Sequence, residues 1–198
     1  MGFKKLELDG RCAVVIGGTS GIGRAIAHGL AEAGADVVCT SRRQEQVDAA
    51  AGEIEAFGRR SLKVTSDVDD AESLRDLLAA CTGEFGKVDI LVNSAGRTKR
   101  VPAVDFDEED WNAIMETNLT GTLRSCQIFG RHMLERGYGR IINIASLSSF
   151  VSLFEVAAYS ASKAAVASLT KSLAIEWAKG GVNVNAIAPG VFKTSLNQ

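Results

Sequence analysis

The sequence predicts one α/β domain, in which a doubly wound parallel sheet lies between two layers of helices. Short runs rich in β-branched apolar residues alternate with longer amphipathic stretches along the chain. Most of these runs are continuously apolar, which fits strands that are buried on both faces of a parallel sheet. A glycine-rich loop follows the first run. Strand–helix–strand units joined by right-handed crossovers therefore predict a three-layer sandwich.

Six strands and five helices are expected from this alternation. The strands are predicted at residues 12–17, 36–40, 61–65, 90–92, 140–144 and 182–187. The helices are predicted at residues 22–33, 44–57, 71–85, 107–118 with a continuation toward 136, and 157–178. Glycine commonly ends a helix, and Gly34 and Gly58 follow two of these segments. The last helix carries an apolar stripe at spacings of three and four residues, formed by Val166, Leu169, Leu173 and Trp177.

The length and composition indicate a single globular domain and argue against nucleic-acid and membrane partners. A chain of 198 residues with 46% hydrophobic and 23% charged residues fits a single globular domain, residues 1–198. The net charge of -2 provides no basic surface, so we expect no nucleic-acid partner. No apolar stretch approaches the ~20 residues that span a bilayer, so we expect no membrane partner.

The N-terminal charges and the cysteines predict where the protein is located and whether it binds a metal. The apolar run that follows Lys4 and Lys5 is too short for a signal peptide, so we expect a cytoplasmic protein. The cysteines are scattered without a C-x-x-C pair, which predicts reduced thiols and no metal site. They are Cys12, Cys39, Cys81 and Cys126.

The glycine-rich loop between the first strand and the first helix predicts a dinucleotide site. Its glycines follow the pattern G-x-x-x-G-x-G, which allows a tight turn and close approach of the backbone to a pyrophosphate. The N–H groups at the start of the helix would bind that anion. The alternative is a glycine-rich turn that binds nothing. The predicted contacts are Gly17, Thr19, Ser20, Gly21, Ile22 and Gly23.

The end of the second strand predicts the choice of cofactor. A carboxylate at this point would bind the ribose 2′-OH of NAD, but no acidic residue occurs before Glu45. Ser41, Arg42 and Arg43 stand there instead, and guanidinium groups suit a 2′-phosphate. We therefore predict NADP(H) bound through Ser41 and Arg42, with NAD as the second choice. The alternative is a pair of solvated arginines at a helix start.

Tyr159 and Lys163 stand four residues apart on a predicted helix, so their side chains share one face. A fixed ammonium stabilises a phenolate, and the pair predicts a general acid/base. Alone, such a pair is more often a half-buried tyrosine and a surface lysine. Ser146 lies thirteen residues earlier at the carboxyl end of a strand, where ligands bind in α/β folds. Other serines close to it are Ser148, Ser149 and Ser152.

Taken together, these motifs resemble the short-chain dehydrogenase/reductase family, in particular its gluconate 5-dehydrogenase-like and 3-oxoacyl-carrier-protein reductase-like members. Further segments that match the family in order and spacing are Asp67-Val68, Asn93-Ser94-Ala95-Gly96, Asn118, and Pro189-Gly190 followed by Thr194. The resemblance implies a Rossmann-type fold with strand order 3-2-1-4-5-6. It further implies an oxidoreductase that interconverts a secondary alcohol and a ketone.

The resemblance also assigns roles to residues. Ser146 would orient the substrate oxygen, Tyr159 would exchange its proton, and Asn118 would anchor a proton relay to Lys163. Tyr159 and Lys163 would also contact the nicotinamide ribose. The adenine would lie against Asp67 and Val68, and other implied cofactor contacts are Asn93, Ala95, Gly96, Pro189, Gly190 and Thr194. The residues expected near the substrate are Phe150, Leu153, Phe154 and Val191.

The chain departs from the family pattern after Pro189-Gly190. Family members usually continue with a substrate-covering helix pair and a seventh strand, whereas this sequence stops eight residues after Gly190. We therefore expect a truncated domain without the seventh strand. The resemblance implies a homo-oligomer, a dimer or tetramer paired through the long helices. Two alternative functions stay open: a catalytically impaired dinucleotide-binding module and an NAD-preferring dehydrogenase.

Overall fold

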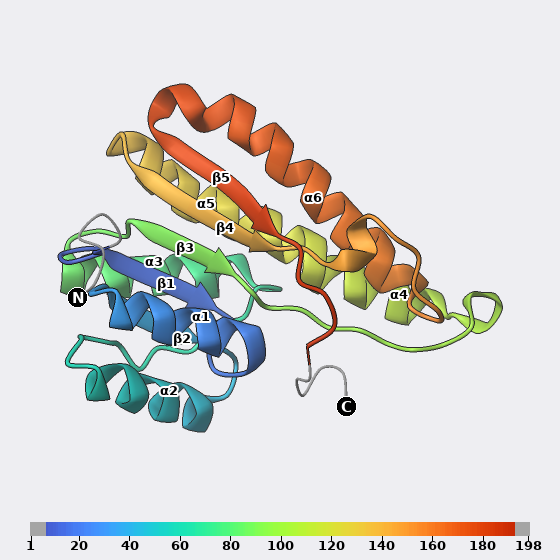
Figure 1. Ribbon diagram of the computed structural model, residues 1–198, viewed down its shortest axis with the longest axis horizontal. Helices are drawn as coiled ribbons and strands as arrows, with labels where there is room; N and C mark the ends of the chain where they lie inside the picture. Colours follow the sequence, from blue (N-terminus) through green and yellow to red (C-terminus); the bar gives the residue numbers. More distant parts are fainter. Residues whose placement is uncertain (1–6, 193–198) are drawn as a thin grey trace.

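The computed structural model describes residues 7–192, which form a parallel sheet with helices on both faces (Figure 1). The sheet has five strands in the order β2-β1-β3-β4-β5, and every pairing is parallel. This is the three-layer doubly wound architecture that the sequence predicts. The strands are β1 (Cys12–Ile16), β2 (Asp36–Thr40), β3 (Ile90–Asn93), β4 (Gly139–Ile144) and β5 (Val182–Ile187).

The helices lie close to their predicted positions. Asp70 and Asp107 begin two of them, since each side chain accepts a hydrogen bond from a first-turn N–H, of Glu72 and Asp110 respectively. Gly86 ends α3 in the left-handed conformation that glycine adopts without strain. The helices are α1 (Gly21–Glu32), α2 (Gln44–Ala56), α3 (Ala71–Phe85), α4 (Glu108–Met115), α5 (Gly121–Glu135) and α6 (Ala157–Trp177).

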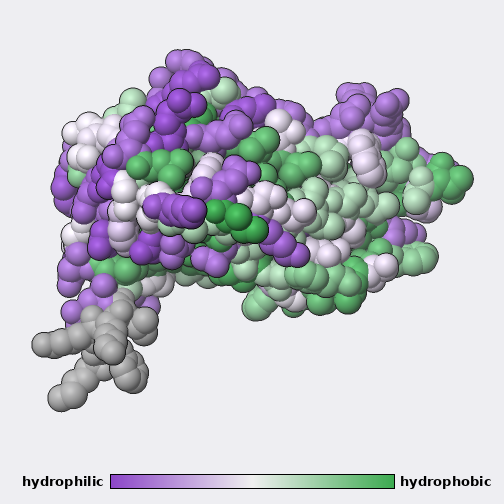
Figure 2. Space-filling view, turned by 90° about the horizontal axis from the view of Figure 1, so that it is seen from above, coloured by the Kyte–Doolittle hydropathy of each residue, from purple (hydrophilic) through white to green (hydrophobic). Residues whose placement is uncertain are grey.

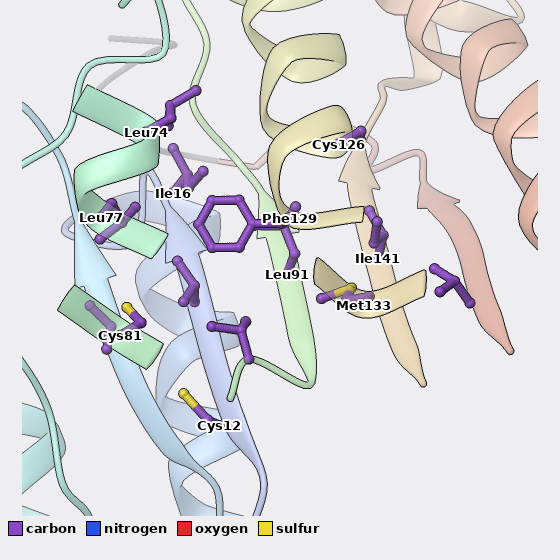
Figure 3. Packing of buried hydrophobic residues seen from close by; sticks show 14 of the residues in the cluster. Cys12, Ile16, Leu74, Leu77, Cys81, Leu91, Cys126, Phe129, Met133 and Ile141 are labelled. Carbon is purple, nitrogen blue, oxygen red and sulfur yellow. The ribbon is translucent and has the colours of Figure 1, made fainter. Parts of the chain in front are cut away.

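Two hydrophobic cores lie on opposite faces of the sheet because successive strand residues point to opposite sides. Ala13 and Val15 of β1 pack with α1 and α2, whereas Val14 and Ile16 pack with α3, α5 and α6. Figure 3 shows Phe129 of α5 in the second core, beside Leu91 of β3. The continuously apolar strands are therefore buried on both faces, and they hold the loops at their carboxyl ends on a rigid base.

One expected strand is not formed. The segment 61–65 has no strand structure, although it runs beside β2. Val37 N–H donates to Arg60 O at 3.0 Å, and Ser66 N–H donates to Ser41 O at 3.1 Å. Between these bonds, the Thr40 hydroxyl donates to Val64 O at 2.7 Å, in place of a backbone amide. The predicted order 3-2-1-4-5-6 is therefore correct for five strands, and its outer edge is an irregular segment.

The long helix expected from residue 107 toward 136 is interrupted by a π-helical turn. This turn covers Glu116–Thr120 and joins α4 to α5. A π-turn accommodates an extra residue in a helix, and such turns often occur at functional sites. Here it carries Asn118, whose side chain is buried.

The apolar and polar surfaces are unevenly distributed. Figure 2 shows more apolar residues toward the right-hand end, where Figure 1 places α4, the start of α6 and the loops beyond the carboxyl ends of the strands. Exposed apolar side chains near this end include Phe150, Phe154 and Val191. Within residues 7–192, no helix combines the length and the apolar character needed to cross a membrane.

Candidate active site

A pocket of about 270 Å³ lies at the carboxyl ends of the strands, where the loops after β1, β3, β4 and β5 meet the start of α6. Ligands in open α/β sheets bind in this position. Of the predicted site residues, ten line this pocket. They are Gly17, Ser20, Gly21, Ile22, Gly96, Ser146, Tyr159, Lys163, Pro189 and Gly190.

The backbone of the glycine loop packs closely against the loop after β3 and against itself. Gly17 has φ 78°, and a Cβ there would lie 2.6 Å from the backbone N of Ala95. A Cβ at Gly23 would lie 2.2 Å from Gly17 O, so neither position can hold a side chain. Ser20 precedes α1 but makes no side-chain capping bond, and the first turn carries no acidic residue. The helix therefore presents N–H groups and the positive end of its dipole to the pocket.

The end of β2 carries hydroxyl and cationic groups. The Ser41 Oγ is buried without a hydrogen-bond partner among the described residues. Arg42 and Arg43 are exposed, and neither forms an ion pair within residues 7–192. Thr19 turns toward α2, where its hydroxyl contacts Gln46 Oε1 at 3.4 Å. The turn between β2 and α2 thus offers donors to an anion, and it carries no carboxylate before Glu45.

Lys163 is buried beside the catalytic candidates rather than solvated. Its side chain is on α6, the residue is 5% exposed, and Nζ donates a hydrogen bond to Ile144 O at 2.6 Å. Nζ lies 5.8 Å from the centre of the Tyr159 ring. Burial lowers the pKa of Lys163 to about 8, because desolvation disfavours the charged form. The surface-lysine alternative is therefore wrong.

Ser146 follows β4, and the short helical turn after it fixes its position. Its Oγ accepts a hydrogen bond from Ser148 N–H at 3.2 Å, and its own N–H donates to Ser149 Oγ at 3.3 Å. Ser149 Oγ in turn donates to Lys163 O at 2.8 Å. Of the four serines considered, Ser146 alone lines the pocket, and Ser149 joins its loop to α6.

Asn118 ties three segments together beneath the pocket. Its Oδ1 accepts from Arg97 N–H at 2.8 Å, and its Nδ2 donates to Arg97 O and to Ser162 Oγ, each at 3.0 Å. A Cβ at Gly96 would lie 3.3 Å from Asn118 Oδ1 and 3.7 Å from Lys163 Nζ. The π-turn thus brings Asn118 close to Lys163, although Asn118 does not line the pocket.

The remaining predicted residues lie outside this pocket. Asn93 is buried and donates to Asn143 Oδ1 at 2.9 Å, while Asp67 accepts from the N–H of Asp69 at 3.0 Å. Val68 packs in the core against α5, at Gly121. Thr194 lies outside the described residues. Also away from the pocket lining are Thr19, Gly23, Ser41, Arg42 and Ala95.

A second pocket of about 450 Å³ adjoins the first and shares Ser146, Tyr159 and Gly190 with it. Ser146 and Tyr159, which both carry hydroxyl groups, therefore line both pockets. A reacting group held at the junction would meet two donors, with the ammonium of Lys163 behind them. The apolar part of the second pocket is formed by Leu147, Leu153, Phe154, Val156 and Val191.

Several lining residues were not expected from the sequence. Ser94, Ile144, Ala145 and Phe192 line the first pocket, and their positions beside the predicted motifs are the only signal that could have identified them. In the second pocket, Thr98 and Arg100 form a polar side. They belong to no motif, so their location depends on the path of the loop after β3. Of the expected substrate-side residues, Phe150 is 70% exposed and lines neither pocket.

Comparison with known proteins gives consistent matches over nearly the whole chain. The family model of the short chain dehydrogenases matches residues 11–198. The 2-dehydro-3-deoxy-D-gluconate 5-dehydrogenase of Bacillus subtilis is 47% identical over 96% of this chain and 74% of its own length. The D-threitol dehydrogenase of Mycolicibacterium smegmatis is 41% identical over 96% and 73%. A solved gluconate 5-dehydrogenase from Burkholderia cenocepacia, in complex with NADP and tartrate, has TM-score 0.93 and 39% identity, covering 98% of this chain and 76% of that one.

Proposed function

This chain belongs to the short-chain dehydrogenase family of oxidoreductases, and from that premise we propose that it is an NADP(H)-dependent enzyme interconverting a secondary alcohol and a ketone. One observation carries the proposal. Ser146 and Tyr159 line the junction of two adjoining pockets, and the buried Lys163 ammonium lies 5.8 Å from the tyrosine ring. A carbonyl at this junction would meet both hydroxyls.

The cofactor choice rests on the fit between NADP and the residues at the β1 and β2 ends. Gly17 and Gly23 have no side chains, so the loop backbone can approach a ligand closely, and the start of α1 has no side-chain cap. Exposed backbone N–H groups at this point suit a pyrophosphate. The buried Ser41 Oγ, which has no partner in the described part of the chain, and the nearby Arg42 suit a 2′-phosphate. The Burkholderia relative crystallised with NADP supports this choice. When bound, the nicotinamide supplies or accepts the hydride at the substrate carbon.

Residues of the protein orient the substrate oxygen and transfer its proton. Ser146 donates a hydrogen bond that orients the carbonyl oxygen, and Tyr159 transfers its phenolic proton to that oxygen as it becomes an alcohol. The positive charge of Lys163 stabilises the resulting phenolate. In the direction of oxidation, Tyr159 takes the proton from the alcohol. Donors fixed where negative charge develops usually contribute about 10²–10³ in rate each.

Asn118 is proposed to act as a positioning residue in this scheme. It holds both backbone groups of Arg97 and the hydroxyl of Ser162, which neighbours Lys163 on α6. Its amide therefore sets the spacing between the loop after β3 and the helix that carries the acid/base pair. This arrangement supports the part of the scheme in which Lys163 stays close to Tyr159.

A homo-oligomer is also proposed, with α5 and α6 at the interface. A groove of about 720 Å³ is lined mainly by α5, with Arg75 of α3 and Trp177 at the end of α6 completing its lining. Its α5 residues include the apolar Ile128 and Leu134 beside the charged Arg131 and Glu135, a mixture that suits packing of α5 against a second copy. Light scattering after size-exclusion chromatography tests this, and a strictly monomeric protein at micromolar concentration contradicts it.

The central experiment measures oxidation of NADPH and NADH with a panel of ketones, and reduction of NADP⁺ and NAD⁺ with the matching alcohols. We expect turnover that favours NADPH, and we expect Tyr159→Phe to lower kcat by about 10³ while cofactor binding is retained. Tyr138→Phe is the matched control, because Tyr138 lies between Arg11 and Arg140 at the other end of the sheet. Cofactor binding without turnover would support the binding-module alternative, and unchanged activity in Tyr159→Phe would refute the proton donor.

A further inference from the structure

The second pocket has one charged residue among the described residues that line it. This residue is Arg100, and the lining also includes Thr98 and apolar residues such as Phe154. The Thr98 Oγ1 is buried and has no hydrogen-bond partner within the described part of the chain. A substrate in this pocket would therefore meet a hydroxyl and a guanidinium beyond the reacting carbon.

The guanidinium of Arg100 already has an anionic partner. Arg100 Nε lies 3.4 Å from Glu155 Oε2, and the backbone of the two segments is joined next to this pair, since Val101 N–H donates to Glu155 O at 2.9 Å. Glu155 stands between Phe154 and Val156, which both line the pocket. Its carboxylate is therefore the ion-pair partner of the cationic residue of the pocket, in a pair whose side chains are 69% (Arg100) and 32% (Glu155) exposed.

Glu155 also adopts a costly backbone conformation. Its φ of 62° makes it the only non-glycine residue in the left-handed region among residues 7–192. Residues other than glycine, asparagine and aspartate rarely adopt this conformation, and such outliers often occur near functional sites. The conformation directs the Glu155 carbonyl toward Val101 and its side chain toward Arg100.

We propose that Glu155 determines substrate class by occupying Arg100, so that the pocket selects uncharged polyols and hydroxyketones over sugar acids. A substrate carboxylate would have to displace Glu155 from Arg100 or lie beside a like charge, and both lower affinity. A substrate hydroxyl instead finds the unpartnered Thr98 hydroxyl. This inference rests on the proposed function, because it assigns the second pocket to the substrate.

The test compares D-threitol with D-threonate, in which a carboxylate replaces one terminal CH2OH group, with NADP as cofactor. The wild-type enzyme is expected to have a higher kcat/KM for threitol. Glu155→Gln keeps the shape and removes the charge, and it should shift the threonate/threitol ratio of kcat/KM toward threonate by about twofold to fivefold, the range expected for a partly exposed ion pair. The gain should appear in KM rather than kcat, because Glu155 does not line the junction with Ser146 and Tyr159.

Two further variants separate this role from general effects. Glu109→Gln removes the same charge from an exposed position in α4 and should leave the ratio unchanged. Adding Arg100→Gln to Glu155→Gln should abolish the gain for threonate. A wild-type preference for threonate, or an unchanged ratio in Glu155→Gln, overturns the inference. Lack of turnover with every alcohol and ketone in the panel refutes the proposed function itself.

Discussion

The two ends of the sheet each hold a buried charged residue, but the number of partners around that residue differs. At the amino end, Asp89 is 0% exposed and receives bonds from the Cys12 N–H, Lys87 and Arg136, with Arg11 at 3.5 Å. Burial disfavours ionisation of Asp89, but the Cys12 N–H and the surrounding cations outweigh it and lower its pKa.

At the carboxyl end, Lys163 is buried beside a single hydrogen-bond acceptor in the described structure, Ile144 O, and its pKa is lowered. This difference distinguishes a structural charge from a catalytic one. A charge that stabilises the fold has several hydrogen-bond and ion-pair partners, whereas a charge available for chemistry has fewer partners and faces a pocket.

Lys163→Met should give the largest effect, and it should be on activity. Removal of the ammonium leaves the Tyr159 phenolate unsupported, so kcat/KM should fall by about 10³, or about 4 kcal/mol of transition-state stabilisation. Steady-state kinetics with NADPH measure this. Thermal unfolding serves as the control, and a large drop in Tm would show that Lys163 is structural instead.

Asp89→Asn should give the reverse pattern. Loss of the carboxylate charge leaves the cations of Lys87 and Arg136 partly buried without compensation, which costs about 3 kcal/mol of unfolding free energy. Urea unfolding measures that loss. The kcat of the folded fraction should stay within about twofold of the wild type, since Asp89 lies at the opposite end of the sheet from the pocket. A specific loss of kcat would break the contrast.

The lowered pKa of Lys163 should make the free energy of unfolding depend on pH. Its pKa is about 8 in the folded protein and 10.5 when solvated, so the unfolded state binds more protons between these values. The free energy of unfolding should therefore rise with pH, by about 2–3 kcal/mol between pH 7.5 and 10. Urea unfolding from pH 7.5 to 10 tests this, and Lys163→Met should flatten the profile. A wild-type profile as flat as that of the variant contradicts the buried ammonium.

Ser41→Ala should give the smallest effect, confined to cofactor choice. The Ser41 hydroxyl has no partner among the described residues, so its removal should not destabilise the fold, whereas the preference for NADPH over NADH should fall by about tenfold. Ser66→Ala is the matched control. Its hydroxyl bonds Thr40 at 3.0 Å, so it should lower stability by about 1 kcal/mol and leave cofactor preference unchanged. Equal NADPH preference in both variants would contradict the role of Ser41.

Local motifs made much of the fold and the pocket predictable. The glycine loop, Ser146 and the pair Tyr159–Lys163 lie at strand ends or on one helix face, so their positions follow from short-range geometry. The strand expected at 61–65 was wrong because its strand propensity did not reveal that a side chain, Thr40, replaces a backbone partner. Arg100 and Glu155 were missed because they meet only after two loops fold together.

The π-helical turn at Glu116–Thr120 makes residue count, as well as residue identity, important for this site. Deleting one residue there would allow a regular α-helix, yet it would rotate one side of the helix by about 100° relative to the other. Asn118 would then turn away from Arg97 and Ser162 without any change in its chemical nature. Helix content would be preserved while the two segments flanking Lys163 lost their shared anchor.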